Sequence, residues 1–205
     1  LISGSTRAVG FWSAALATVF SIMYDVGQIA EWLGWLGSRG GPESASTPLG
    51  LIVLLTPSLF LGSAFLLLAV SIHQLSSPDR KVYSQAALAF ATAYAVLISV
   101  TYYVQLTLVA PRLAGGRVAG IEPFLFVPFD SFLYSVDILG YSFMSVATLF
   151  AAGVFTGRGL ERVARLFLLA NGLLLPFLVL QIYFHWMIWV AALWAVTFPG
   201  ATWSL

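Results

Sequence analysis

The chain has 205 residues, of which 60% are hydrophobic, 15% aromatic and only 8% charged. A soluble domain carries roughly 25% charged residues, so this composition excludes a free soluble protein. The net charge of +1 supplies no basic surface for nucleic acid, and the absence of cysteine excludes disulfides and thiolate chemistry. Composition therefore predicts a single membrane domain over residues 1–205, whose partner is the lipid bilayer.

Six apolar segments, each long enough to cross a bilayer core of about 30 Å, are separated by charged or Gly/Pro-rich breaks. We expect the spans at about residues 10–36, 49–75, 83–109, 129–155, 162–184 and 187–205. The break near His185 is the weakest of the five, and without it the last two spans would form one long helix. The predicted fold class is an all-α, polytopic transmembrane helical bundle with six spans.

The basic residues predict the orientation of this bundle. Six of them fall on the N-terminal side of the membrane, namely Arg7, Arg80, Lys81, Arg158, Arg162 and Arg165. Only Arg39, Arg112 and Arg117 fall on the opposite side. Because Lys and Arg favour the cytoplasmic side, we expect a cytoplasmic N-terminus, and tryptophans near the ends of the predicted helices agree.

The first predicted span contains a stripe of polar residues at helical spacing: Thr18, Ser21, Asp25, Gln28 and Trp32. Glu31 is expected to turn away from this stripe and to cap the helix at the outer interface. The span is too long for a signal peptide and carries two acids. Since the chain begins with Leu, we expect that it has lost either its initiator Met alone or the initiator Met and more.

The fourth predicted span carries a second stripe, formed by Asp130, Tyr134, Asp137, Tyr141 and Thr148. Shorter alignments occur in the third span, at Tyr94, Thr101 and Gln105, and in the fifth, at Asn171, Gln181 and His185. A carboxylate at mid-membrane costs roughly 2.5–3.5 kcal/mol on insertion scales, so each one requires a partner, a water-filled cavity or a function.

Counting about 1.5 Å per residue along each helix places most of these polar residues in the outer half of the membrane. We therefore predict an acidic, hydrated ligand-binding pocket there, formed by Asp25, Gln28, Gln105, Tyr134, Asp137, Tyr141, Gln181 and His185. The segment of residues 121–129 is apolar and broken by two prolines; it either covers this pocket or simply connects two spans. The alternative for the amides is that they only hydrogen-bond to neighbouring helices.

The two histidines, His73 and His185, fall at opposite ends of the bundle, which argues against a bis-histidine haem. A single axial histidine, or a metal bound by Asp25, Asp137 and His185, stays open, so the cofactor and the metal are unknown. The common motifs of hydrolases, zinc proteases and nucleotide-binding enzymes are absent. The sequence thus favours a protein that is not an enzyme, although acid–base catalysis by the outer acids and His185 stays open.

Several short motifs occur from the third to the fifth span: Gln105-Leu106-Thr107, Leu139-Gly140-Tyr141, the segment of residues 147–152, Gly159-Leu160-Glu161-Arg162 and Ala170-Asn171-Gly172. On these motifs the chain resembles a family of uncharacterised bacterial six-helix integral membrane proteins. The resemblance implies a multi-pass protein of the bacterial cytoplasmic (inner) membrane. It implies no activity and assigns no functional residue.

Three functions follow from these observations. The first is the binding or transport of a small cation, an amine solute or protons through the acidic pocket. The second is an accessory or structural subunit of a larger, energy-converting membrane complex, with other membrane proteins as partners. A homo-oligomer is the other partnership that stays open, and it would count against this second function. The third is an intramembrane enzyme. Purification in mild detergent separates the first two, because an accessory subunit would emerge in a hetero-complex.

Overall fold

The computed structural model describes residues 4–205, and every regular element in this range is helical. Six helical segments of the described chain are long and apolar enough to cross a membrane. They are Gly4–Trp32, Pro48–Leu75, Pro78–Ala114, Phe132–Ala152, Leu160–Leu180 and His185–Trp203. The prediction of a six-span helical bundle is confirmed, and the chain is a multi-pass integral membrane protein.

Three of the six spans are uninterrupted helices: α1 (Gly4–Trp32), α2 (Pro48–Leu75) and α5 (Phe132–Ala152). The third span comprises η1 (Pro78–Arg80), α3 (Lys81–Val104), the π-helical turn η2 (Gln105–Val109) and α4 (Ala110–Ala114). The fifth comprises α6 (Leu160–Gly172) and α7 (Leu175–Leu180), and the sixth comprises η4 (His185–Met187), α8 (Ile188–Ala191) and α9 (Trp194–Trp203). A short helical turn, η3 (Glu122–Phe124), lies between α4 and α5.

The ends of the spans differ from the predicted ones where a capping residue or a backbone conformation decides them. The Thr47 hydroxyl accepts a hydrogen bond from the Gly50 N–H at 3.0 Å and caps α2. Ser131 caps α5 in the same way, because its hydroxyl accepts from the Tyr134 N–H at 3.1 Å. The predicted start at Phe129 is wrong, since Phe129 has a φ of 73° and cannot continue a right-handed helix.

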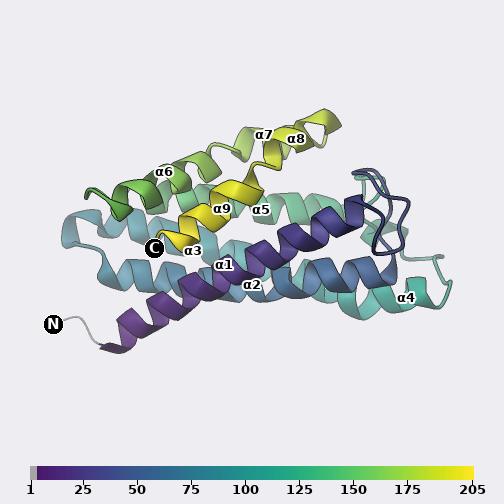
Figure 1. Cartoon of the computed structure of the whole chain (residues 1–205), viewed down its shortest axis with the longest axis horizontal. Coiled ribbons are helices and arrows are strands. Elements are labelled where there is room, and N and C mark those ends of the chain that lie inside the picture. The colour runs from purple at the N-terminus through teal and green to yellow at the C-terminus, as the bar shows by residue number, and fades with distance from the viewer. Residues whose placement is uncertain (1–3) are drawn as a thin grey trace.

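The third span is longer than predicted and the fifth is divided. The predicted end at residue 109 is wrong because η2 carries the helix on into α4. Between α6 and α7 the helix is interrupted at residues 173–174, just before Pro176, whose missing N–H cannot continue the hydrogen-bonding pattern. The weak break near His185 exists, since residues 181–184 form a turn and α9 then runs back along the bundle (Figure 1).

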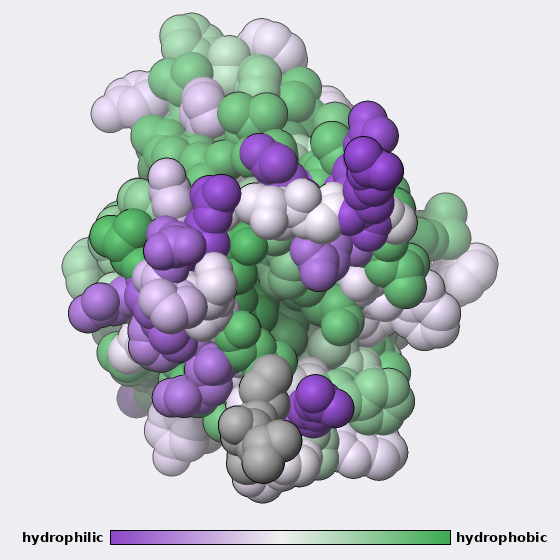
Figure 2. Space-filling model, turned by 90° about the vertical axis from the view of Figure 1, so that its left-hand side faces the viewer, coloured by the Kyte–Doolittle hydropathy of each residue, from purple (hydrophilic) through white to green (hydrophobic). Residues whose placement is uncertain are grey.

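The helices pack into one bundle in which α1 contacts α2 and α9, α3 contacts α2 and α5, and α6 contacts α5 and α9. We call the end that carries residues 33–47, 115–131 and 181–184 the outer end, and the opposite end the inner end. Figure 2 views the inner end, where hydrophilic residues surround an apolar hollow. The described basic residues of the inner end include Arg80, Lys81 and Arg162. The orientation of the bundle in the membrane stays a prediction.

Candidate ligand-binding cavity

A cavity of about 420 Å³ lies at the outer end of the bundle. Its walls come from α1, the first turns of α2, the first half of α5, and the segment from α7 to α9. Tyr102 of α3 contributes to one wall, and residues 126, 127 and 129 of the connecting segment before α5 contribute to another. The volume lies in the range of roughly 300–1,000 Å³ that is usual for sites of small molecules.

The structure brings six of the eight predicted site residues to this cavity: Asp25, Gln28, Tyr134, Asp137, Tyr141 and Gln181. They come from α1, α5 and the turn after α7, so helices far apart in the sequence place their polar stripes around one space. Asp25 and Asp137 both line the cavity rather than facing lipid on separate sides. That these residues bind a ligand stays a prediction.

The other two predicted site residues do not line the cavity. Gln105 is buried in the π-helical turn, and its Nε2 donates a hydrogen bond to the Phe124 carbonyl at 2.6 Å. His185 stacks on Phe129, with ring centroids 4.4 Å apart. Both side chains therefore contact the segment of residues 121–131, three residues of which line the cavity. Their predicted place among the cavity-lining residues is wrong, and they hold this covering segment instead.

Glu31 was expected to turn away from the stripe of α1 and to lie at the interface. In the structure it is only 3% exposed and lines the same cavity as Asp25. The sequence contains a signal for this placement, because Tyr24, Gln28 and Glu31 stand four and three residues apart and so share one face. Tyr24 also lines the cavity and donates a hydrogen bond from its hydroxyl to Gln28 Oε1 at 3.1 Å.

Three side chains of the cavity wall carry buried polar atoms that have no hydrogen-bond partner. They are both carboxylate oxygens of Glu31, Oδ1 of Asp137 and Nε1 of Trp194. Asp137 is 8% exposed and Trp194 is 7% exposed. A buried polar group without a partner costs free energy, and a buried charge costs more. Single atoms of this kind also occur outside the wall, at Tyr94, Thr101, Ser145 and His185, so it is the gathering of two carboxyl groups and an indole N–H around one space that marks the cavity as the candidate site.

Aromatic rings form much of the wall beside the acids. Trp194 meets Tyr24 edge to face at a centroid distance of 5.6 Å, and meets Tyr141 in the same way at 5.8 Å. The hydroxyls of Tyr102 and Tyr141 are hydrogen-bonded to each other at 2.8 Å. Lys, Arg and His are all missing from the side chains that line the cavity. Carboxylates beside aromatic faces, without a basic residue, form a site whose chemistry suits a positively charged ligand.

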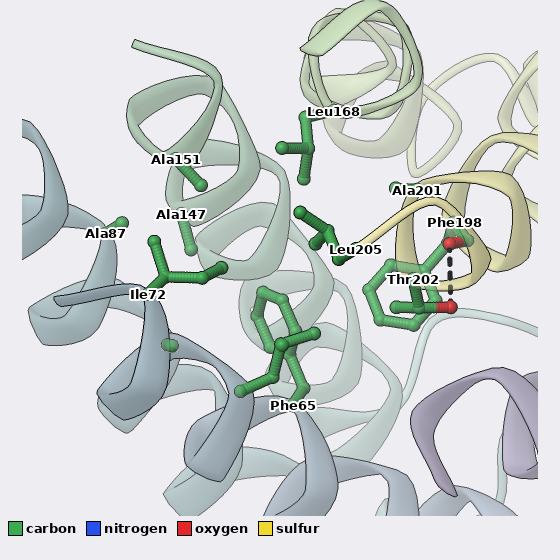
Figure 3. Close-up of a pocket in the computed structure, with 12 residues that line it drawn as sticks. Phe65, Ile72, Ala87, Ala147, Ala151, Leu168, Phe198, Ala201, Thr202 and Leu205 are labelled. Carbon is green, nitrogen blue, oxygen red and sulfur yellow. Dashed lines mark hydrogen bonds between the residues drawn. The ribbon is translucent and has the colours of Figure 1, made fainter. Parts of the chain in front are cut away.

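A closed set of aromatic contacts lies between this cavity, which Trp194 and Tyr141 line, and the inner end. Trp194 stacks on Phe198, Phe198 packs against Phe65, Phe65 against Tyr94, and Tyr94 against Tyr141, which returns to Trp194. The centroid distances are between 5.4 and 5.9 Å. We call these five residues the aromatic barrier. Phe65 and Phe198 also line a much smaller pocket, of about 10 Å³, on the other side of it (Figure 3).

Other polar residues of the predicted stripes have structural contacts away from the cavity. Asn171 donates from Nδ2 to Thr148 Oγ1 at 3.2 Å, and its Oδ1 accepts from the Thr197 hydroxyl at 3.1 Å. The polar side chains therefore serve two purposes, one at the cavity and one between helices. Within residues 4–205 there is no group of three acids or histidines placed to hold a metal ion, so Asp25, Asp137 and His185 do not form one.

Comparisons with known proteins add no identification. No protein-family model, curated protein or solved structure matches the chain. The resemblance to bacterial six-helix membrane proteins accordingly stays a prediction. The function is argued below from the cavity alone.

Proposed function

We propose that this protein binds a small organic cation, an amine, in the cavity at its outer end and moves it across the membrane. The observation that supports this most directly is the meeting of Asp25, Asp137 and Glu31 with aromatic rings in one wall that has no basic residue. An ammonium group would pair with the carboxylates and contact the ring faces, so one ligand would compensate both the unpaired charge and the open aromatic surface.

Asp137 is the residue that we expect to contact the ammonium group. It is buried on α5, faces the cavity, and leaves Oδ1 without a partner. Asp25 approaches from α1, and its neighbour Tyr24 lines the same cavity. The bound cation would therefore join α1 to α5 at the centre of the outer half. The size of the cavity suits an organic amine rather than a bare metal ion or a proton.

The test is amine binding to the full chain in lipid nanodiscs, measured by calorimetry with n-pentylamine and with the neutral 1-pentanol as the reference. We expect the amine to bind, the alcohol not to bind, and Asp137→Asn to weaken amine binding at least about tenfold, which corresponds to roughly one lost charge-assisted contact. The amide is cheaper to bury than an unpaired carboxylate, so this variant should fold at least as stably as the parent chain.

Asp130→Asn is the matched control, because Asp130 lies exposed at the same end and outside the cavity wall. It should leave amine binding unchanged. Equal binding of the amine and the alcohol, or equal effects of the two Asp→Asn variants, would contradict the proposed function. A hetero-complex that survives detergent and binds no amine would favour the accessory-subunit function instead.

For the cellular location we propose the cytoplasmic membrane of a bacterium, with the N-terminus inside the cell. The resemblance described above supports the bacterial membrane. The excess of Lys and Arg at the inner end supports the orientation. The orientation can be tested with a reporter that is active on only one side of the membrane and is fused to the C-terminus. With six spans the C-terminus should lie on the cytoplasmic side.

A further inference from the structure

Glu31 stands apart from the other two acids of the cavity. It lies in the last turn of α1 and packs against Gly50 in the first turn of α2; a Cβ at position 50 would lie 2.6 Å from Oε2. The amino end of a helix carries a partial positive charge, which stabilises a nearby carboxylate. The Gly50 N–H, however, donates to Thr47, and both Glu31 oxygens have no hydrogen-bond partner. The carboxylate is thus fixed in place but unpaired.

The three acids form two acidic ends of one cavity. Asp25 and Glu31 are six residues apart on α1, which separates their backbones by about 9 Å along the helix axis. Asp137 belongs with Asp25, because both lie at a similar depth: Asp137 is five residues inside the outer end of α5 and Asp25 is seven residues inside the outer end of α1. Glu31 lies toward the loop of residues 33–47, four residues of which line the cavity. The inner acidic end therefore holds two carboxylates and the outer acidic end holds one.

The wall between the two acidic ends is largely apolar. Ile29 of α1 lines it, together with Leu51, Leu54 and Leu55 of α2, and Gln28 is the polar residue of α1 between the two acids. A hydrocarbon chain gains free energy by contact with such a surface. A ligand with a single ammonium group at the inner acidic end would leave the Glu31 carboxylate buried and unpaired, which is costly in a low dielectric.

Resting on the proposed function, we infer that the ligand is a linear diamine, with one ammonium group between Asp25 and Asp137 and the other at Glu31. The methylene chain between the two amines lies along the apolar wall formed by α1 and α2. Glu31 then selects diamines over monoamines, whereas Asp137 is needed for both.

The experiment compares two series of probes on the full chain in nanodiscs: the linear α,ω-diamines from diaminopropane to diaminooctane, and the n-alkyl monoamines of the same chain lengths. We expect the best diamine to bind at least about tenfold more tightly than the monoamine of equal length. The affinity of the diamines should pass through an optimum at an intermediate length, because the separation of the acidic ends is fixed. Glu31→Gln should lower the affinity for the best diamine toward that of its monoamine, and should lower the affinity for the monoamine far less.

Glu122→Gln is the matched control, because Glu122 is exposed at the same end and outside the cavity wall. It should preserve the preference for diamines. Should Glu31→Gln fail to fold, the length series on the parent chain decides: affinity that rises steadily with length in both series contradicts a second ammonium site. Monoamines and diamines that bind equally well overturn this inference while the proposed function stands. The absence of binding by any amine overturns the proposed function itself.

Discussion

At the scale of single residues, Asp137 and Asn171 show that buried polar groups serve two different purposes in this bundle. Asn171 is completely buried and joined to two other helices through Thr148 and Thr197. Asp137 leaves one carboxylate oxygen unpartnered at the cavity wall. Hydrogen bonding therefore accounts for the first residue, whereas the second carries a cost that a bound ligand would offset.

Asn171→Ala should reduce stability and leave the cavity intact. The variant removes two interhelical hydrogen bonds, and such bonds contribute roughly 0.6–1.7 kcal/mol each in membrane bundles, so a loss of about 1–3 kcal/mol is expected. The measurement is reversible unfolding in mixed micelles, with n-pentylamine binding as a second readout. Thr92→Ala serves as the control, because the Thr92 hydroxyl bonds only within its own helix. Weakened amine binding in a folded Asn171→Ala protein would contradict this division of roles.

At the scale of elements, the sequence predicted the polar stripes of α1 and α5 well because both are regular helices. Asp25, Gln28, Tyr134 and Asp137 reach the cavity as their spacing indicates. Gln105 does not, although it shares a buried face with Tyr94 and Thr101 as predicted, because this face meets the Phe124 carbonyl of the segment before α5 instead of the cavity.

The missed residues have two different causes. Glu31 was misplaced although its spacing from Tyr24 and Gln28 would have placed it on the buried face. Trp194 lies in a span without a polar stripe, and its place at the cavity depends on how α9 folds back against α1 and α6. Only the tertiary structure could provide that information.

Gln105 and His185 should control how fast the ligand enters and leaves the cavity, without contacting the ligand themselves. Both hold the segment of residues 121–131, through the Phe124 carbonyl and the Phe129 ring. Removing these contacts should loosen the segment that closes one wall of the cavity. We expect His185→Ala to accelerate both the dissociation and the association of the amine several-fold. His185→Phe should keep the ring stacking on Phe129 and therefore the rates of the parent chain.

The measurement is stopped-flow exchange of a fluorescent amine, with equilibrium affinity determined in parallel. Trp186→Ala offers a control in the same turn, since this side chain is exposed and outside the cavity wall. A loss of equilibrium affinity at unchanged rates in His185→Ala would show a direct contact with the ligand and would contradict the covering role.

At the scale of the whole molecule, the aromatic barrier lies between the cavity and the small inner pocket. Phe198 is fully buried and contacts both Trp194 and Phe65, so it joins the side of the barrier that faces the cavity to the side that faces the small inner pocket. Transport of a cation requires this barrier to open in some state of the protein. Pro199 directly follows Phe198 in α9 and has no N–H to donate to the helical hydrogen bonding, so the helix lacks one bond at this point.

Phe198→Ala should therefore leave amine binding intact and make reconstituted vesicles leaky to amines. The lost ring removes the contact between the two halves of the barrier, and the void joins the cavity to the inner pocket shown in Figure 3. The readout is the efflux of radiolabelled pentylamine from proteoliposomes. Phe198→Leu keeps most of the side-chain volume, so its efflux should lie between those of the parent and of Phe198→Ala. Phe60→Ala is the matched control, because Phe60 is more than half exposed on α2. If efflux matched the parent in a folded Phe198→Ala protein, the aromatic barrier would not be what blocks the path.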